Sequence, residues 1–531
     1  MKNVAMVKPA VEMQRNSISP RNLRRMGVSG AALMCCAMTG CVVGPKYHAP
    51  VTQAPAVYKE APATQRSQNT NTGTWTVAQP QDAMLRGNWW EVFHEPELNA
   101  LEDELNIDNQ TIKLYFENFM EARALIGEAR SQYFPTVSTG PSWRRSLSSA
   151  NLTNASNAVA AGVTTNVGAK STIYSLPLDV SWAPDIWGKV RNEVRSYQYS
   201  AQVSAADLEN ERLTEQIALA EYFFEIRGQD ALIRLYAETI AADKNALQLT
   251  QTQYETGVGD KISVVQAQAT LQAAESNATN LEVFRAQYEH AIAVLVGKQA
   301  SNFSIPIRPL MTAPPPVPIG VPSQLLQRRP DIAAAERTMA AANAQIGIAY
   351  AAYYPDLTLS ASGGFESSTF KHLFDWPSRF WSIGPSVSET IYDGGLRRAT
   401  VHQYVAMYNA DLANYRQTVL TAFQQVEDYL AQVRILSRQI EQQRQAVASD
   451  QLALDLEMAR YRTGIDPYID VVTLQSALLN GQQVLANLQI EQMTGAVALV
   501  GSLGGGWDTT QLPTPSQVEK TPNVAETKIQ Q

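Results

Sequence analysis

The segment "YETGVGDKISVVQAQ" at residues 254–268 returns in altered form as "YRTGIDPYIDVVTLQ" at residues 461–475, 207 positions later. Seven of the fifteen positions are identical in the two copies. Each copy closes a proline-free stretch of 68 residues, residues 189–256 and residues 396–463. A long proline-free stretch that twice ends in the same glycine-containing motif indicates two copies of one structural unit.

Two further pairs of segments support this duplication. "ALIGEARSQYFPTV" at residues 124–137 matches "AQIGIAYAAYYPDL" at residues 344–357, with an offset of 220. "DIWGKVR" at residues 185–191 matches "YDGGLRR" at residues 392–398, with the offset of 207. The extra 13 residues fall in residues 148–171, which are rich in Ser, Asn, Ala and Gly and have the composition of a solvent loop.

Each copy is expected to fold in the same order. Helical periodicity covers residues 97–133 and residues 331–353, and Pro330 and Asp331 suit the start of the second helix. Alternation of apolar and polar residues then predicts strands at residues 174–182, 357–365 and 381–392, with a weaker fourth strand at residues 136–145. The fold class that follows is mainly α with a small β part, built from a duplicated unit of strands and a long helical hairpin.

The two 68-residue stretches are predicted to be continuous helices. At 1.5 Å per residue, each would reach roughly 100 Å, more than three times the hydrocarbon core of a bilayer, which is about 30 Å thick. Charged residues such as Glu209, Arg227 and Glu427 occur along both stretches. These helices are therefore not expected to lie in lipid.

The repeated motif is predicted to be the hairpin turn at the end of each long helix. Gly257 and Gly464 can take the left-handed conformation that ends a helix. The chain is then expected to restart a helix with Asp260 as N-cap in the first copy, and with Asp466 as N-cap and Pro467 at the first helical position in the second. The returning helices, residues 262–296 and 468–500, are about half as long.

The N-terminus has the features of an export signal. Six basic residues precede a mainly apolar run at residues 26–40, which is too short for a stable membrane anchor. "MTGC" at residues 38–41 places small residues directly before Cys41, as in a bacterial lipoprotein processing site, although a plain secretory cleavage nearby remains the alternative. Cys35 and Cys36 would be removed with the signal, so Cys41 would be the single cysteine of the mature chain and no disulfide framework is available.

Charge and motif content exclude several function classes. Removal of residues 1–40, which carry a net charge of +5, takes the formal charge from −8 to −13, and so acidic a protein is a poor nucleic-acid binder. The five histidines are dispersed without metal-site spacing, and "LVGKQA" lacks the upstream glycine of a phosphate-binding loop. We therefore expect no enzyme activity, no cofactor and no metal site.

The predicted strands require partners. Four strands cannot close a membrane barrel, and an open sheet edge in lipid leaves backbone donors and acceptors unpaired at several kcal/mol each. Three chains would supply twelve strands, which is a size that closes. The alternative function class is a purely structural periplasmic coiled coil. The predicted amphipathic strands argue against it, because a coiled-coil scaffold does not require strands.

The chain resembles the TolC-like outer membrane factors, and among them the lipoprotein branch of resistance-nodulation-division type efflux systems. The resemblance rests on "CVVGPKYHAP" from residue 41, "NWWEVFHEPELNAL" from residue 88, "DIWGKVR", "VPSQLLQRRPDI" from residue 321, and the paired motifs. It implies a homotrimer, lipid-anchored in the cell outer membrane, with a 12-stranded β-barrel and an α-helical tunnel through the periplasm. It also implies a periplasmic adaptor protein fed by an inner-membrane pump, which together export drugs or other small solutes. The outer membrane component of a type I protein secretion system is the alternative.

The resemblance also assigns roles to the two turns. The adaptor is expected to dock on Thr256, Gly257, Val258, Gly259 and Asp260 of the first turn and on Thr463, Gly464, Ile465, Asp466 and Pro467 of the second. The alternative is that the glycines are turn residues only. The tunnel is expected to narrow at Ile469, Asp470 and Thr473, where Thr473 departs from the Asp that is frequent in the family. A carboxylate at Asp470 could instead stabilise the N-terminus of its helix.

The predicted domain organisation follows from these segments. In chain order it comprises a signal peptide (1–40), an extended lipid-anchored segment (41–96), the first repeat (97–297), a proline-rich crossover (298–328), the second repeat (329–501) and a flexible tail (502–531). The aromatic residues of "NWWEVF" and "EYFFEIR" are expected to be packed rather than to bind a ligand.

Overall fold

The structure is a computed structural model of the 531-residue chain. It describes residues 42–50, 54–55, 57–60, 87–147, 149, 170–310, 313–317 and 322–519, so that Cys41 and the signal segment lie outside the described residues. The chain divides into two units. The sheet unit contains the described residues of Met1–Pro45, Ser131–Glu193 and Ile346–Val401, and the helical unit contains those of Lys46–Arg130, Val194–Gln345 and His402–Gln531.

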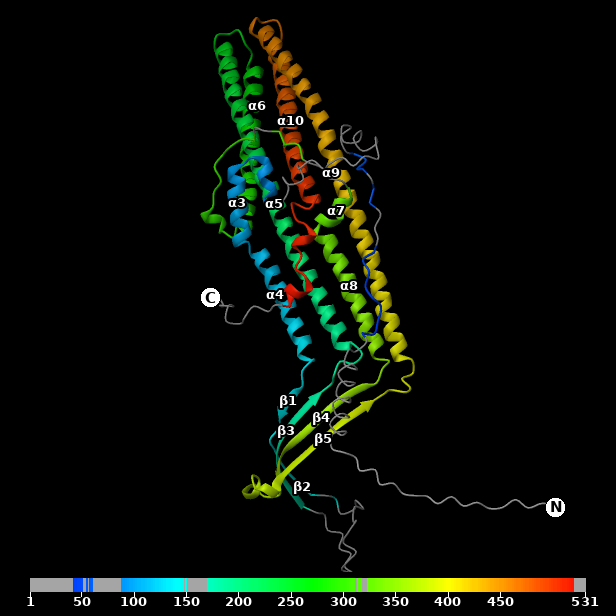
Figure 1. Ribbon diagram of the computed structural model, residues 1–531. Helices are drawn as coiled ribbons and strands as arrows, with labels where there is room; N and C mark the ends of the chain where they lie inside the picture. Colours follow the sequence, from blue (N-terminus) through cyan, green and yellow to red (C-terminus); the bar gives the residue numbers. More distant parts are fainter. Residues whose placement is uncertain are drawn as a thin grey trace, which may run out of the picture. The chain divides into compact units, whose positions relative to one another are not determined.

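Four helices form the two long hairpins (Figure 1). The long helices are α5 (Lys189–Glu255) and α9 (Leu396–Arg462), each of 67 residues. The returning helices are α6 (Lys261–Leu295) and α10 (Tyr468–Ser502), each of 35 residues. The predicted long helices are confirmed to within one residue at their C-terminal ends, and the duplicated order of elements is confirmed with them.

The helix predicted over residues 97–133 is wrong, because two helices occupy this region. They are α3 (Pro96–Asp108) and α4 (Gln110–Ser131), separated by Asn109 with φ −61° and ψ 124°. The buried Asn109 side chain donates to Glu215 and to the Leu295 carbonyl, and it accepts from the Ile112 backbone amide. The bond from the Ile112 amide satisfies a donor that the start of α4 leaves free, and the other two fix the side chain of Asn109.

The core of the helical unit contains the aromatic residues that the sequence analysis assigned to packing. Trp89 and Phe223 are fully buried, Phe224 is 1% exposed, and Phe93 packs on Phe224 with ring centroids 5.2 Å apart. The packing interpretation of both aromatic segments is therefore confirmed.

A buried ion network fastens the crossover to α5. Asp230, with a fully buried side chain, accepts from Arg285 Nε at 2.7 Å and from the Arg308 backbone amide at 2.8 Å. Arg227 donates to the Pro306 carbonyl at 2.6 Å. Residues 303–310 contain no helix or strand, but the predicted crossover also includes a 3-10 turn at Ala300–Asn302 and the helix α7 (Pro322–Arg328), and over these residues the prediction is wrong.

The flexible tail is also predicted wrongly over its first part. Helix α10 continues to Ser502, and residues 515–518 form α11 (Pro515–Val518). Gln202 donates to the Pro513 carbonyl at 2.8 Å, and Arg130 pairs with Glu519 at 3.1 Å. Hydrogen bonds to α4 and α5 therefore hold the chain through Glu519, and the residues beyond lie outside the described part.

The sheet unit contains one antiparallel sheet with the order β1-β3-β4-β5 (Figure 1). Its strands are β1 (Thr136–Thr139), β2 (Ser142–Leu147), β3 (Lys170–Trp182), β4 (Asp356–Ser367) and β5 (Arg379–Ser388). Strands β1 and β2 pair with successive parts of β3. The single fourth strand of the prediction is therefore divided at Gly140 and Pro141, because proline has no N–H to give to a strand ladder.

The strand predicted to reach Tyr392 ends at Ser388 instead. The Asp393 carboxylate accepts from the backbone amides of Gly395 and Arg397, and also from Arg397 Nε at 2.8 Å. These bonds cap the start of α9 and lower the pKa of Asp393. The cap requires a turn at this point, and a turn ends the strand.

Within the sheet unit, the residues directly after Cys41 are fixed to the start of α5. The Val43 amide donates to the Trp187 carbonyl at 3.2 Å, and Asn192 donates to the Val43 carbonyl at 3.0 Å. Gly44 has φ 122°, and a Cβ there would lie 2.6 Å from the Cα of Gly347 in α8 (Pro330–Ala351). Only glycine meets both conditions. The "GPKY" motif thus serves a close approach of two backbones.

Candidate functional site

The turn between α5 and α6 has the geometry of a glycine-capped helix end. Gly257 has φ 76°, and its amide donates to the Tyr254 carbonyl at 3.0 Å. The amides of Val258 and Gly259 both donate to the Gln253 carbonyl, at 2.9 and 2.8 Å. These bonds satisfy carbonyl groups that the end of the helix would leave free. A Cβ at Gly257 would meet nothing within 4 Å.

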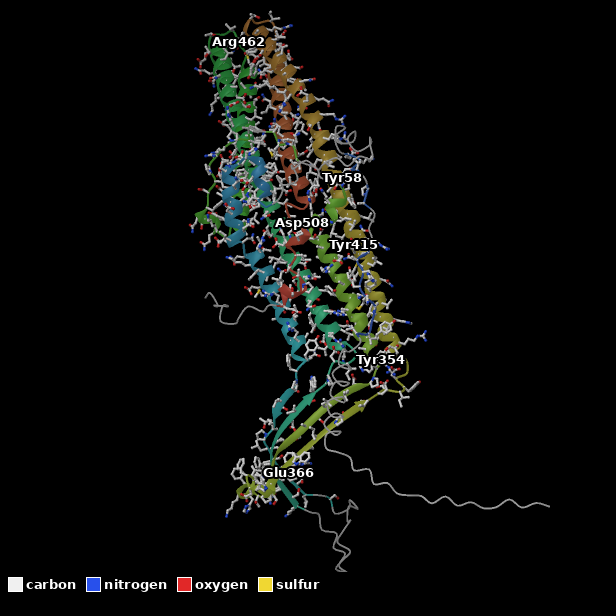
Figure 2. The ribbon with its side chains drawn as sticks, viewed as in Figure 1. Tyr58, Tyr354, Glu366, Tyr415, Arg462 and Asp508 are labelled. Atoms are coloured by element: carbon white, nitrogen blue, oxygen red, sulfur yellow. The ribbon has the colours of Figure 1, made fainter. Side chains whose placement is uncertain are left out.

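The turn between α9 and α10 repeats this backbone. Gly464 has φ 75°, and its amide donates to the Tyr461 carbonyl at 2.9 Å. The Ile465 amide donates to the Arg460 carbonyl at 3.1 Å. A Cβ at Gly464 also meets nothing within 4 Å. Figure 2 marks the place of this turn with Arg462, the last residue of α9. The two predicted turns are confirmed as hairpin tips.

Each tip exposes one aliphatic side chain at the same position of the repeat. Val258 is 82% exposed and Ile465 is 66% exposed. Such side chains at the end of a hairpin contribute nothing to the packing of their own chain. Each tip therefore presents a glycine-capped turn with one exposed aliphatic side chain at the matching position.

The two tips differ in their side-chain caps. Asp260 is the N-cap of α6, its carboxylate accepts from the Ser263 amide at 2.7 Å, and this bond lowers the pKa of Asp260. The prediction for the second tip is wrong, because Pro467 is the N-cap of α10 and Asp466 does not cap it. Asp466 instead accepts from Arg460 Nη2 at 3.0 Å.

An ionic cluster at the second tip replaces that cap. The hydrogen bond from Arg460 lowers the pKa of Asp466. Loss of hydration raises the pKa of the neighbouring Glu457, and the Asp466 carboxylate adds to that rise. Asp470, in the first turn of α10, contributes to the same field. The second tip thus carries more charged side chains, of both signs, than the first.

The predicted constriction residues lie on the solvent side of α10. Ile469 is 44% exposed, and Asp470 and Thr473 are exposed. Tyr468 and Val471 point the other way, into a small cluster that also contains Ala246, Ala267 and Tyr461. The structure thus leaves the three constriction side chains available, while their role in closing a pore stays a prediction.

Polar contacts that the sequence analysis missed join the two hairpins below the tips. Tyr461 donates from its hydroxyl to the Gln253 side chain, and Gln475 donates to Asp243 of α5. Tyr461 and Gln475 are the first and last identical positions of the repeated motif, and that identity was the available signal. Asp243 is 2% exposed and its Oδ2 atom has no hydrogen-bond partner among the described residues. Burial raises the pKa of Asp243 to about 6, against the opposing effect of the Gln475 bond.

The sheet has one apolar face and one hydroxyl-bearing face. The register places Leu178 opposite Gly363 and Gly363 opposite Trp381, so side chains in line with Leu178 share a face. This apolar face carries Val137, Trp143, Leu178, Leu359, Trp381 and Ile383, all of them exposed by 37% or more. The opposite face carries Ser138, Ser175, Ser181, Ser360, Ser362 and Ser386. An apolar face of this extent is unfavourable in water.

Comparison with known proteins now identifies the family. The family model described as "Outer membrane efflux protein" matches residues 109–298 and 321–505, which is more than half of the chain. The chain belongs to the outer membrane efflux protein family. The resemblance found in the sequence is thereby confirmed, as is the predicted role as an outer membrane efflux component.

Relatives of this outer membrane efflux protein extend over nearly its whole length. The antibiotic efflux pump outer membrane protein ArpC of Pseudomonas putida is 30% identical over 474 residues, which cover 88% of this chain and 93% of ArpC. The pyoverdine export outer membrane protein OpmQ of Pseudomonas putida is 28% identical over 440 residues, 81% of this chain and 90% of OpmQ. The solved outer-membrane channel OprN has a TM-score of 0.76 and 27% identity, covering 88% of this chain and all of that one.

Among the described residues, no helix is both long enough and apolar enough to cross a membrane. Within the same residues, no cluster of three or more His, Cys, Asp or Glu side chains is placed to hold a metal ion.

We predict that stability at neutral pH is limited by Asp243. The folded pKa of about 6 lies above the ordinary value of 3.8, so the folded state is favoured while Asp243 is protonated. This stabilisation is complete below about pH 3.8 and is lost as the pH rises through about 6. Asp243→Asn keeps an acceptor for Gln475 without the buried charge. At about pH 7.5 it should raise the unfolding temperature, and the gain in the free energy of unfolding should be at most about 3 kcal/mol.

Thermal unfolding of the purified protein at two pH values checks this prediction. At about pH 3.5, Asp243→Asn and the original protein should unfold at nearly the same temperature. Asp455→Asn is the matched control, because Asp455 is an exposed carboxylate of α9 that accepts from Gln451 at 3.0 Å. An equal effect of Asp243→Asn at both pH values would contradict the assignment.

Proposed function

We propose that three copies of this chain form the outer membrane channel of a tripartite efflux pump. The observation that carries the proposal is the sheet, which has an exposed apolar face, a hydroxyl-bearing face and four strand positions. Three such sheets supply twelve positions, enough to close a barrel with the apolar face toward lipid and the serines toward the lumen. The helical hairpins then continue into the periplasm as a tunnel.

The proposed cargo is small solutes, including drugs. The relatives are named for antibiotic efflux and for pyoverdine export, which are unrelated chemistries. A lumen lined mainly by serine hydroxyls offers little discrimination between such compounds, since small neutral side chains make few directed contacts. We infer that selection takes place in an inner-membrane pump, joined to this channel by a periplasmic adaptor. Export of proteins by a type I system is the second candidate, which the names of the relatives do not favour.

Lipid attachment at Cys41 is part of the proposal. Its support is the "MTGC" site together with the hydrogen bonds that join Val43 to Trp187 and Asn192. In the chain, α5 is the next element after β3. An acyl chain on Cys41 would therefore start beside the membrane-facing strands. Each buried CH₂ of an acyl chain adds about 0.8 kcal/mol of membrane affinity.

We expect the mature protein to begin at an acylated Cys41. Intact mass spectrometry of protein extracted from the outer membrane would show the acyl mass on a chain that starts at residue 41. Cys41→Ser should abolish that mass and leave the trimer assembled, because the barrel holds the membrane by itself. A mature start at any other residue would show that the site is a plain secretory cut.

Adaptor docking is proposed for the two tips. Two tips per chain give six per trimer, with the same backbone and the same exposed aliphatic position at Val258 and Ile465. Six near-equivalent ends suit a ring of adaptor hairpins. The open space at Gly257 and Gly464 means that a larger side chain there would project outward and not into the fold.

A pair of double variants tests the docking proposal. We expect Gly257→Trp with Gly464→Trp to abolish drug resistance in cells that lack the original gene, at unchanged trimer level, because the indoles would block the adaptor. Gly257→Asn with Gly464→Asn is the control, since Asn tolerates the left-handed conformation and is small. It should retain most of the resistance. Full resistance in the Trp pair would exclude docking at these turns.

The resting constriction is proposed at Ile469, Asp470 and Thr473. Their exposure on α10 leaves them free to converge on the axis of a trimer. Three carboxylates from Asp470 would then repel one another and attract cations. The helix-end alternative, a stabilisation of about 0.3 to 1 kcal/mol, needs no such convergence.

Conductance in planar bilayers separates these two roles. We expect Asp470→Asn to weaken cation selectivity or raise the open fraction of the purified trimer, because it removes three charges from the narrowest point. Asp260→Asn is the matched control at the other tip, where Asn can still cap α6, and it should leave the pore unchanged. An unchanged pore with a small loss of thermal stability in Asp470→Asn would support the helix-end role alone.

A further inference from the structure

The connection between β4 and β5 is a compact folded turn. It contains two single turns of 3-10 helix, Phe370–His372 and Trp376–Ser378. His372 Nδ1 lies 2.7 Å from Asp375 Oδ2, and the Ser378 hydroxyl donates to the His372 carbonyl at 2.6 Å. Leu373 is 6% exposed and anchors the turn from within. These contacts define the shape of the turn, so the side chains on its outer surface have fixed positions.

Aromatic rings of this turn fold onto the apolar face of the sheet. Phe370 packs edge-on against Tyr174 at 5.7 Å, and Phe374 against Phe365 at 5.6 Å. The register places Tyr174 and Phe365 on the apolar face, in line with Leu178. Figure 2 shows rings gathered at this end of the strands, near Glu366. The turn therefore extends the apolar face beyond the end of β4.

These rings remain largely uncovered in the chain. The exposed fractions are 67% for Phe370, 64% for Phe374, 76% for Trp376 and 80% for Trp381. Strand β4 begins at Asp356, after α8, and the turn lies at the other end of β4, where it connects to β5. Aromatic side chains at the end of a membrane-facing surface occupy the level of the lipid headgroups.

Basic side chains accompany the rings. Arg379 pairs with Phe365 in the register, so it lies on the apolar face, where its guanidinium covers the Trp376 ring. Lys371 follows Phe370 within the first 3-10 turn and is exposed. Arg145 and Lys170 lie on the apolar face farther along β2 and β3. The chain as a whole has a net charge of −8, so this basic end is a local feature. Arg and Lys that emerge beside rings at a bilayer surface reach the phosphate groups of lipids.

We propose that this cluster, comprising Phe370, Lys371, Phe374, Trp376, Arg379 and Trp381, binds the phosphate-bearing headgroups of anionic lipids in the leaflet at that end of the sheet. The inference rests on the proposed function, since it requires the apolar face to be in a membrane. The rings set the depth of the sheet in the bilayer, and the two basic side chains bind the headgroup. The site is thus a lipid-recognition surface at the end of the sheet away from Asp356.

Native mass spectrometry of the full-length protein released from lipid nanodiscs tests the proposal. The probes are nanodiscs of phosphatidylcholine alone and of phosphatidylcholine mixed with phosphatidylglycerol. The original protein should retain phosphatidylglycerol in preference to phosphatidylcholine. Lys371→Gln with Arg379→Gln should reduce that preference by about fivefold or more. Arg144→Gln is the matched control, because Arg144 is an exposed cation of β2 on the opposite, hydroxyl-bearing face, and it should leave the preference unchanged.

The outcomes distinguish this inference from the proposed function. Insertion into nanodiscs without any preference for phosphatidylglycerol, or an equal loss in Arg144→Gln, would overturn the lipid site and leave the channel intact. Displacement of the retained lipid by inorganic phosphate alone would identify the ligand as a free anion and would also overturn it. Failure to insert into either kind of nanodisc would overturn the proposed function itself.

Discussion

A β-sheet that enters lipid must have all of its backbone donors and acceptors paired, because each unpaired group costs several kcal/mol there. The sheet of this chain ends at β1 and β2 on one side and at β5 on the other, and no other described strand pairs with these edges. Its apolar face is exposed at Trp381 and Ile383 by 80% and 76%. The single chain is therefore incomplete as a membrane protein, and the proposed trimer follows from this constraint more directly than from any individual contact.

The two repeats of the chain have similar backbones at their hairpin tips but different side-chain chemistry. Gly257 and Gly464 have φ values of 76° and 75°, yet Asp260 caps one helix while Asp466 pairs with Arg460 at the other. A docking partner would thus meet the same shape twice with different charges. The second tip carries more charged side chains, of both signs, than the first.

A similar divergence is found at the matching glycines Gly127 and Gly347. A Cβ at Gly347 would lie 2.5 Å from Asn192 Nδ2, whereas a Cβ at Gly127 would meet nothing within 4 Å. A glycine retained at an open position has no packing reason within its own chain.

The sequence alone determined the elements whose signals are local and periodic. The absence of proline over 68 residues and the glycine motif defined α5, α9 and both tips, since helix continuity and left-handed caps depend on nearby residues. The alternation of the strands defined the apolar face, because side-chain direction has period two. Tertiary structure decided the rest. The break at Asn109 depends on contacts with Glu215 and Leu295. The role of Asp466 depends on Arg460. The pKa of Asp243 depends on its burial between the two hairpins, beside Gln475, which is 232 residues away in the sequence. These features arise where distant segments meet, and a local pattern carries no information about which buried polar group will find which partner.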